Sequence, residues 1–188
     1  YGAQLVIIAT GSHWCGDGSQ PATLRRISNG DGSLTPERIM NGERPKGQRV
    51  VVYDCDGYYV AAGIAELLAN EGYDVHLVTP EDIVSPLSDS TLEGPFLRRH
   101  LHDCGITMHT SITITSRTET GVRGQTQFED PWSLDADDLV LVTHQIPDDE
   151  LYRELSADPE RLTAAGIDGL FLIGDAQSPR WISEAILD

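Results

Sequence analysis

The residues best placed to do chemistry are Asp54, Asp56 and Tyr59, between an apolar run of strand character and an Ala-rich run of helical character. Strand–turn–helix units of this kind bind dinucleotides when the turn carries Gly-x-Gly-x-x-Gly, because glycines let the backbone approach a pyrophosphate at the helix N-terminus. Here Asp54, Asp56 and Tyr59 stand where the three glycines should be. Two carboxylates are expected to repel phosphate, and the Tyr59 ring to prevent close helix–strand contact. The sequence therefore predicts a degenerate nucleotide loop that has kept its frame and lost its ligand.

Two further departures from a nucleotide site support this interpretation. After the second strand of such a unit, an NAD site needs an acidic residue for the ribose and an NADP site needs Arg. Only Glu81 could serve here, and it stands two positions late. Thr143 and His144 follow a later strand, where Gly would leave room for a nicotinamide. NAD(P)H binding at this module is therefore not expected.

No catalytic or metal-binding constellation is predicted. The chain offers no nucleophile–base pair and no paired catalytic carboxylates. His100, His102, Cys104 and His109 are close in sequence, but residues two apart on a helix point to different faces. The three cysteines share no metal-ligand spacing and are expected to be free thiols.

The elements that must position these residues alternate between strands and helices. Apolar runs bounded by Gly, Pro and Asp indicate buried strands, and Thr35-Pro36 and Gly72 are typical helix boundaries. We predict an α/β fold, a Rossmann-like three-layer domain with a parallel sheet and an antiparallel meander, NAD(P)H-domain-like. The expected strands are 5–9, 50–53, 74–78, 106–109, 138–143 and 169–173, and the expected helices are 35–40, 58–70, 94–104, 148–155 and one from about Pro179. The meander is expected over 111–116 and 126–128, with a turn over 121–124.

The composition restricts the possible partners. With 13 Lys and Arg against 30 Asp and Glu, the formal net charge is −17, which argues against nucleic acid and anionic membranes as partners. The acidity has three interpretations: an ordinary acidic surface, salt adaptation in a halophilic source, which we favour, or docking of a basic electron-transfer partner. No run is long enough to span a membrane and no signal peptide is evident, so a cytoplasmic location is expected. The start at Tyr1 and the end at Asp188 suggest a piece of a longer polypeptide.

Taken in order, these segments resemble the C-terminal region of the flavoproteins that include trimethylamine, dimethylamine and histamine dehydrogenases, which are related to 2,4-dienoyl-CoA reductase. The resemblance covers nearly the whole chain. It rests on LVIIATG at 5–11, the degenerate strand–turn–helix–strand unit at 49–79, LVLVT at 139–143 and LFLIGDA at 170–176. The altered glycine motif favours the amine dehydrogenase branch.

The resemblance implies a domain plan. Residues 45–150 correspond to an NAD(P)H-like Rossmann domain, preceded by a connection with a short helix over 17–44. Residues 1–16 and 151–188 correspond to parts of an FAD- or ADP-binding-like domain. In the family, an N-terminal barrel with FMN and a 4Fe–4S cluster oxidises the substrate, and that barrel lies outside this chain.

The resemblance also implies site residues and partners. Gly174 and Asp175 would contact the ribityl phosphate of FAD or the ribose region of ADP, and Thr10 and Gly11 would pass close to the same cofactor. Alternatively, Asp175 only caps a helix. We expect no cofactor in the isolated chain and ADP or FAD in the full-length protein. That protein is expected to be a homo-oligomer that passes electrons to an electron-transferring flavoprotein or a similar acceptor.

Two rival functions remain open from the sequence. The complete protein could be an NAD(P)H-dependent reductase of the 2,4-dienoyl-CoA reductase type, with nucleotide bound despite the altered loop. The chain could instead be a non-catalytic docking module for an electron-transfer partner.

Overall fold

The computed structural model of the protein describes residues 2–21 and 24–180. The chain divides into two compact units: Trp14–His144, and Tyr1–His13 together with Gln145–Asp188. The larger unit contains the strand–turn–helix loop and also the whole 17–44 segment. No helix in the described residues is long and apolar enough to cross a membrane.

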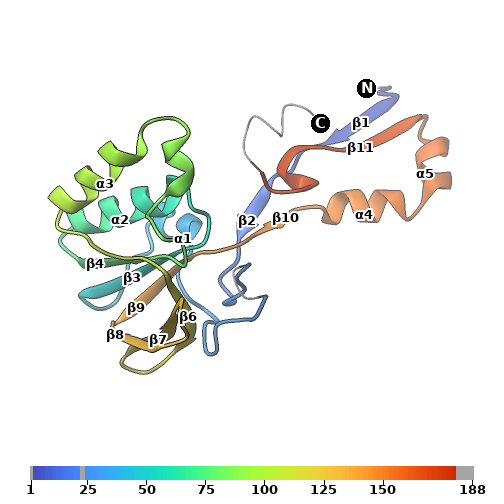
Figure 1. Ribbon diagram of the computed structural model, residues 1–188. Coiled ribbons are helices and arrows are strands. Elements are labelled where there is room, and N and C mark those ends of the chain that lie inside the picture. Colours follow the sequence, from blue (N-terminus) through green and yellow to red (C-terminus); the bar gives the residue numbers. More distant parts are fainter. Residues whose placement is uncertain (1, 22–23, 181–188) are drawn as a thin grey trace. The chain divides into compact units, whose positions relative to one another are not determined.

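A four-stranded parallel sheet in the order β5-β4-β3-β9 forms the centre of the larger unit. Its strands are β3 (Arg49–Asp54), β4 (Asp74–Val78), β5 (Thr107–His109) and β9 (Asp138–Val142). The helices α2 (Val60–Asn70) and α3 (Gly94–Asp103) cover one face, and an antiparallel meander covers the other (Figure 1). The prediction of a three-layer α/β domain with a parallel sheet is therefore confirmed.

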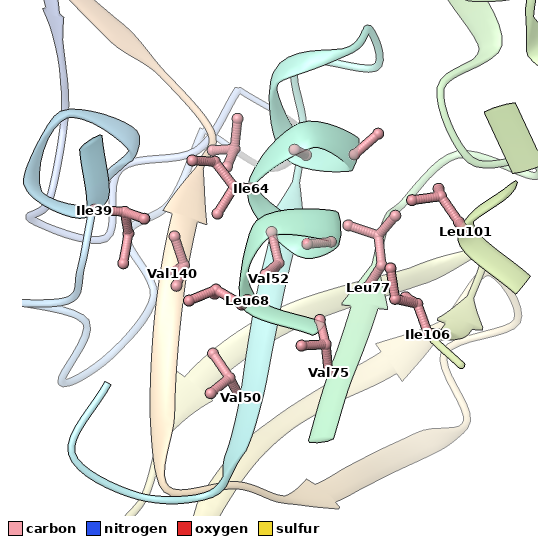
Figure 2. Close-up of a cluster of buried hydrophobic side chains, with 14 of the residues drawn as sticks. Ile39, Val50, Val52, Ile64, Leu68, Val75, Leu77, Leu101, Ile106 and Val140 are labelled. Atoms are coloured by element: carbon pink, nitrogen blue, oxygen red, sulfur yellow. The ribbon is translucent and has the colours of Figure 1, made fainter. Parts of the chain in front are cut away.

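The helix-side core consists of alternate residues of each strand, because successive side chains of a strand point to opposite faces. On β3, Val50 and Val52 face α2, where they meet Ile64 and Leu68 (Figure 2). The short helix α1 (Pro36–Met40) adds Ile39, which is fully buried. The other members that Figure 2 labels are Val75, Leu77, Leu101, Ile106 and Val140.

Tyr53 links the sheet to the opposite layer. It is fully buried among apolar residues of the sheet and the meander. Its hydroxyl donates to Oε1 of Gln20 at 2.8 Å and accepts from the backbone N–H of Ile114 at 3.3 Å. Burial raises the pKa of this hydroxyl above its usual value, so it remains a neutral donor. Gln20 in turn donates from Nε2 to the Ile114 carbonyl at 2.9 Å, which leaves this polar contact satisfied inside the core.

The meander differs from its prediction. It consists of β6 (Ile112–Arg117), β7 (Gly121–Thr126) and β8 (Pro131–Asp135). The 121–124 segment, predicted as a turn, is most of the middle strand, and β8 was not predicted. Two glycines in this segment resemble a turn signal, but they stand where neighbouring strands pack closely. A Cβ at Gly121 would lie 2.1 Å from the Leu134 carbonyl oxygen, and one at Gly124 would lie 2.3 Å from that of Thr113.

The 17–44 segment, expected as a connection, is part of the larger unit's fold. The N–H of Leu34 donates to the Leu139 carbonyl, and its carbonyl accepts from the N–H of Leu141, so this residue extends the sheet beside β9. Ile27 lies in the meander-side core at 2% exposure. Because residues 17–44 are rich in Gly, Ser and Pro, their composition predicted a connection, although a few apolar residues of the segment pack into the core.

The smaller unit contains the two ends of the chain. The strands β1 (Leu5–Ile8) and β11 (Gly169–Leu172) pair in parallel, and β10 (Gln145–Pro147) pairs with β2 (Ser12–Trp14). The helix α4 (Glu150–Ser156) is close to its predicted range, whereas α5 (Pro159–Ala164) was not predicted. A short 3-10 turn, η2 (Gly174–Ala176), follows β11. The helix expected from about Pro179 falls mostly on residues 181–188, outside the described part of the chain.

Candidate functional site

The turn between β3 and α2 is organised by the side chain of Asp54. Its Oδ1 accepts hydrogen bonds from the backbone N–H groups of Asp56, at 3.0 Å, and Gly57, at 2.9 Å. Asp54 is fully buried, and its Oδ2 has no hydrogen-bond partner among the described residues. The carboxyl group is therefore directed into the turn and is not presented to solvent.

This burial changes the acidity of the turn. Loss of hydration raises the pKa of Asp54 to about 7. The hydrogen bonds from the N–H groups of Gly57 and Asp56 lower the pKa and so oppose this rise. Burial also raises the pKa of Asp56, and a hydrogen bond from the Tyr58 backbone opposes that change. The expectation that two charged carboxylates confront a phosphate is thus not met at Asp54, because its side chain folds back onto the turn.

A second segment covers the turn. The 3-10 turn η1 (Pro86–Asp89) approaches Gly57, whose carbonyl accepts from the N–H of Leu87 at 3.1 Å. Gly57 has φ +71°, a conformation that glycine adopts freely, and a Cβ there would lie 3.5 Å from Cγ of Pro86. Ser85, at the start of η1, is fully buried and has φ 51°. No sequence pattern predicts this cover, because it depends on a contact between segments thirty residues apart.

Tyr59 does not obstruct the contact between helix and strand. It is 58% exposed and stands at the N-cap of α2, where its ring meets that of Tyr58 edge-on at 4.8 Å. The predicted steric role of Tyr59 is therefore wrong. The contact between α2 and the sheet is made by other residues, among them the small and fully buried Ala61 and Ala65.

The end of β9 is closed by the segment that precedes α1. Thr143 donates from its hydroxyl to the Ser19 carbonyl at 2.7 Å, and the His144 carbonyl accepts from the N–H of Cys15 at 2.8 Å. After β4, the Thr79 hydroxyl accepts from the N–H of Glu81 at 3.2 Å. The ends of β9 and β4 therefore both make hydrogen bonds within the chain itself.

Thr10, Gly11, Gly174 and Asp175 lie together at one edge of the smaller unit. They follow β1 and β11, whose last residues, 8 and 172, are paired, so the two strand ends are adjacent. Thr10 donates from its hydroxyl to the Asp148 carbonyl, and Gly11 accepts from the Asp148 N–H at 2.9 Å. Asp175 accepts at Oδ1 from the Arg180 N–H at 3.2 Å.

The histidines and cysteine considered for metal binding are dispersed. Nε2 of His100 lies 2.8 Å from Oε1 of Glu66 and 3.7 Å from Sγ of Cys104. His109 instead pairs with His76, with Nε2 and Nδ1 3.0 Å apart. Within the described ranges, no three His, Cys, Asp or Glu side chains are arranged to hold a metal ion.

This geometry defines the larger unit as a Rossmann-type α/β domain whose β3–α2 turn is hydrogen-bonded to the side chain of Asp54. Over residues 34–128, about half of its length, the chain matches the family described as the OYE-like second alpha/beta domain. The chain belongs to that family.

Three similar proteins are named as two amine dehydrogenases and an amine oxidase. The chain is 35% identical to dimethylamine dehydrogenase of Hyphomicrobium sp. (strain x) along its whole length, and it spans 28% of that protein. Among solved structures, histamine dehydrogenase from Rhizobium sp. 4-9 is similar with a TM-score of 0.90 and 30% identity, over 97% of this chain and 29% of that one. The 6-hydroxypseudooxynicotine amine oxidase of Pseudomonas geniculata N1 gives 0.92 and 34%, over 99% and 28%. The resemblance inferred from the sequence motifs is thereby confirmed.

Proposed function

We propose that the chain is the cofactor-domain portion of a flavin-dependent amine dehydrogenase, and that its NAD(P)H-like unit does not use nucleotide. The observation that carries the second part is the Asp54 carboxyl group, which takes both N–H groups of the phosphate turn. Kinship with dimethylamine dehydrogenase supports the first part. Substrate oxidation would then take place at FMN and a 4Fe–4S cluster, in a barrel outside this chain.

The edge formed by Thr10, Gly11, Gly174 and Asp175 is the proposed contact for ADP or FAD in the complete protein. Gly11 has φ +85° and nothing within 4 Å of the position of a Cβ, so its backbone is open to close approach. Gly174 also has a positive φ, 62°. The chain by itself is expected to bind neither cofactor, because only part of such a domain is formed by these residues.

Anaerobic reduction of the complete protein tests the proposal. NADH, NADPH and then a small secondary or primary amine are added in turn while the flavin absorbance is followed. We expect bleaching by an amine and none by either nucleotide. Bleaching by NADPH or NADH would contradict the proposal and favour the alternative, an NAD(P)H-dependent reductase.

An acidic surface offers a docking function for the same protein. The net charge of −17 favours association with a basic face of an electron acceptor, such as an electron-transferring flavoprotein. The affinity of the complex should then fall as sodium chloride is added, because salt screens exposed charges. An affinity that does not change with ionic strength would exclude docking through these carboxylates.

A further inference from the structure

The turn between β3 and α2 has the form of an anion-binding turn. In phosphate-binding loops, successive backbone N–H groups converge on one anion next to a helix N-terminus. Here the N–H groups of Asp56 and Gly57 converge on a single oxygen, Oδ1 of Asp54, and α2 begins three residues after Gly57. The converging donors are present, and the acceptor comes from the chain itself.

We propose that the Asp54 carboxyl group occupies the phosphate position of this turn, so that nucleotide is excluded by internal occupation and not by charge repulsion at an open site. This inference deepens the function proposed above, on which it rests, by naming the residue and the interaction that exclude the ligand.

The position of Asp54 makes occupation possible without distortion of the fold. It is the last residue of β3, an inner strand of the sheet. In this fold the turn after that strand is the one that approaches a bound phosphate. Its side chain is short and reaches the N–H groups two and three residues ahead. Repulsion by Asp54, by contrast, would require its charge at the mouth of the site, and Asp54 is fully buried.

The cover by η1 holds the occupied turn closed. Leu87 donates its N–H to the carbonyl of Gly57, the same residue whose N–H is bound to Asp54. Both backbone groups of Gly57 are therefore used inside the protein. A ligand would have to displace the side chain of Asp54 and the Pro86–Leu87 segment together.

A turn in which Asp accepts from the two or three following N–H groups is also a common local motif. That motif explains the geometry, and its position at the end of β3 places the Asp54 oxygen where a phosphate would bind. Occupation by this oxygen and repulsion by its charge can be separated with one variant that removes the acceptor and another that removes only the charge.

Two substitutions and one small anion make the test. Asp54→Ala removes the acceptor, whereas Asp54→Asn keeps an oxygen at Oδ1 and removes only the charge. Formate, which reproduces the deleted carboxylate, is titrated into the wild-type chain and both variants, with sodium chloride at equal ionic strength as the control. We expect formate to raise the Tm of Asp54→Ala and to shift its Gly57 amide resonance in a saturable manner. The wild type and Asp54→Asn should respond no more than they do to chloride.

Two results would overturn the inference while the proposed function stands. One is an Asp54→Ala variant that folds and is indifferent to formate. The other is binding of inorganic phosphate by Asp54→Asn but not by the wild type, which would identify repulsion as the cause. Binding of NADH or NADPH at this turn in the wild type would instead contradict the proposed function.

A measurement on the wild type serves if Asp54→Ala does not fold. The Gly57 amide proton is followed by NMR as the pH is changed. A shift that follows the titration of the Asp54 carboxyl resonance supports the hydrogen bond on which the inference depends. An amide shift independent of that titration overturns it.

Discussion

Asp54 couples the stability of the larger unit to pH. Its pKa in the folded chain is about 7, against an ordinary value of 3.8, because it is buried. The folded state therefore holds a proton more tightly than the unfolded state does. This contribution to stability is complete below pH 3.8 and is lost as the pH rises toward 7.

The substitution Asp54→Asn should remove this dependence. A shift of one pKa unit corresponds to ~1.4 kcal/mol. We therefore expect the free energy of unfolding of Asp54→Asn, measured relative to that of the wild type, to increase by about 1–4 kcal/mol from acid pH to pH 8. Urea unfolding of both proteins at several pH values measures the difference. Parallel pH profiles would show that Asp54 titrates normally in the folded chain.

Glycines 63 and 124 form a contrasting pair of single residues. Gly63 lies exposed within α2 with nothing within 4 Å of the position of a Cβ, whereas a Cβ at Gly124 would meet the backbone of Thr113. We expect Gly63→Ala to stabilise the chain by about 0.5–1 kcal/mol through helix propensity. Gly124→Ala should destabilise it by about 1–3 kcal/mol through overpacking. Thermal unfolding of both variants checks the opposite signs; equal shifts in Tm would contradict the strand assignment of Gly124.

At the scale of elements, a histidine pair joins the edge strand β5 to β4. Nδ1 of His76 and Nε2 of His109 lie 3.0 Å apart, and the ring of Trp132 on β8 packs edge-on against His109 at 5.5 Å. Asp74 stands 3.5 Å from the other nitrogen of His76 and pairs with Arg49. Burial, and then His76, lower the pKa of His109. Two neutral rings can share one proton in this hydrogen bond, so a proton added at Nε2 of His109 would set two N–H groups against each other.

Acid should consequently loosen this part of the sheet. Since the unfolded chain binds a proton at His109 more readily than the folded chain does, the contribution of His109 to stability falls as the pH decreases through about 6.5, the ordinary histidine value. Relative to the wild type, His109→Gln should therefore gain free energy of unfolding, measured with urea, as the pH decreases from neutral to mildly acid. His102→Gln, an exposed position on α3, is the control. Parallel pH profiles of His109→Gln and the wild type would contradict this role of His109.

The elements that the sequence predicted well are those whose pattern is local. Residues 74–78 alternate between apolar and polar types, and β4 has the predicted bounds. The prediction of a turn in place of β7 was wrong. Gly121 and Gly124 allow neighbouring strands to pack closely, and this need is not visible in a local sequence pattern. Likewise, the sequence located the altered nucleotide turn, but the η1 segment over Gly57 depends on a contact between distant segments and has no local pattern.

At the scale of the whole molecule, the charge of −17 should make stability depend on salt. Like charges on a compact chain repel each other, and salt reduces that repulsion. We expect the Tm to rise as sodium chloride increases from low to molar concentration. Potassium chloride is the comparison salt and should act equally if screening is the cause. A Tm that falls or stays constant would argue against adaptation to salt.

The pairing of β1 with β11 has a consequence for the order of events during synthesis. Leu5 pairs with Gly169, so β1 cannot pair with β11 until residues 169–172 have left the ribosome. Until then, Leu5 and Ile7, which are 61% and 62% exposed, lack β11 as a partner strand. The larger unit is continuous in sequence and can fold first, since domains generally fold as units during synthesis. Its folding brings residues 15 and 144 close together and so shortens the loop that must close before β1 and β11 pair.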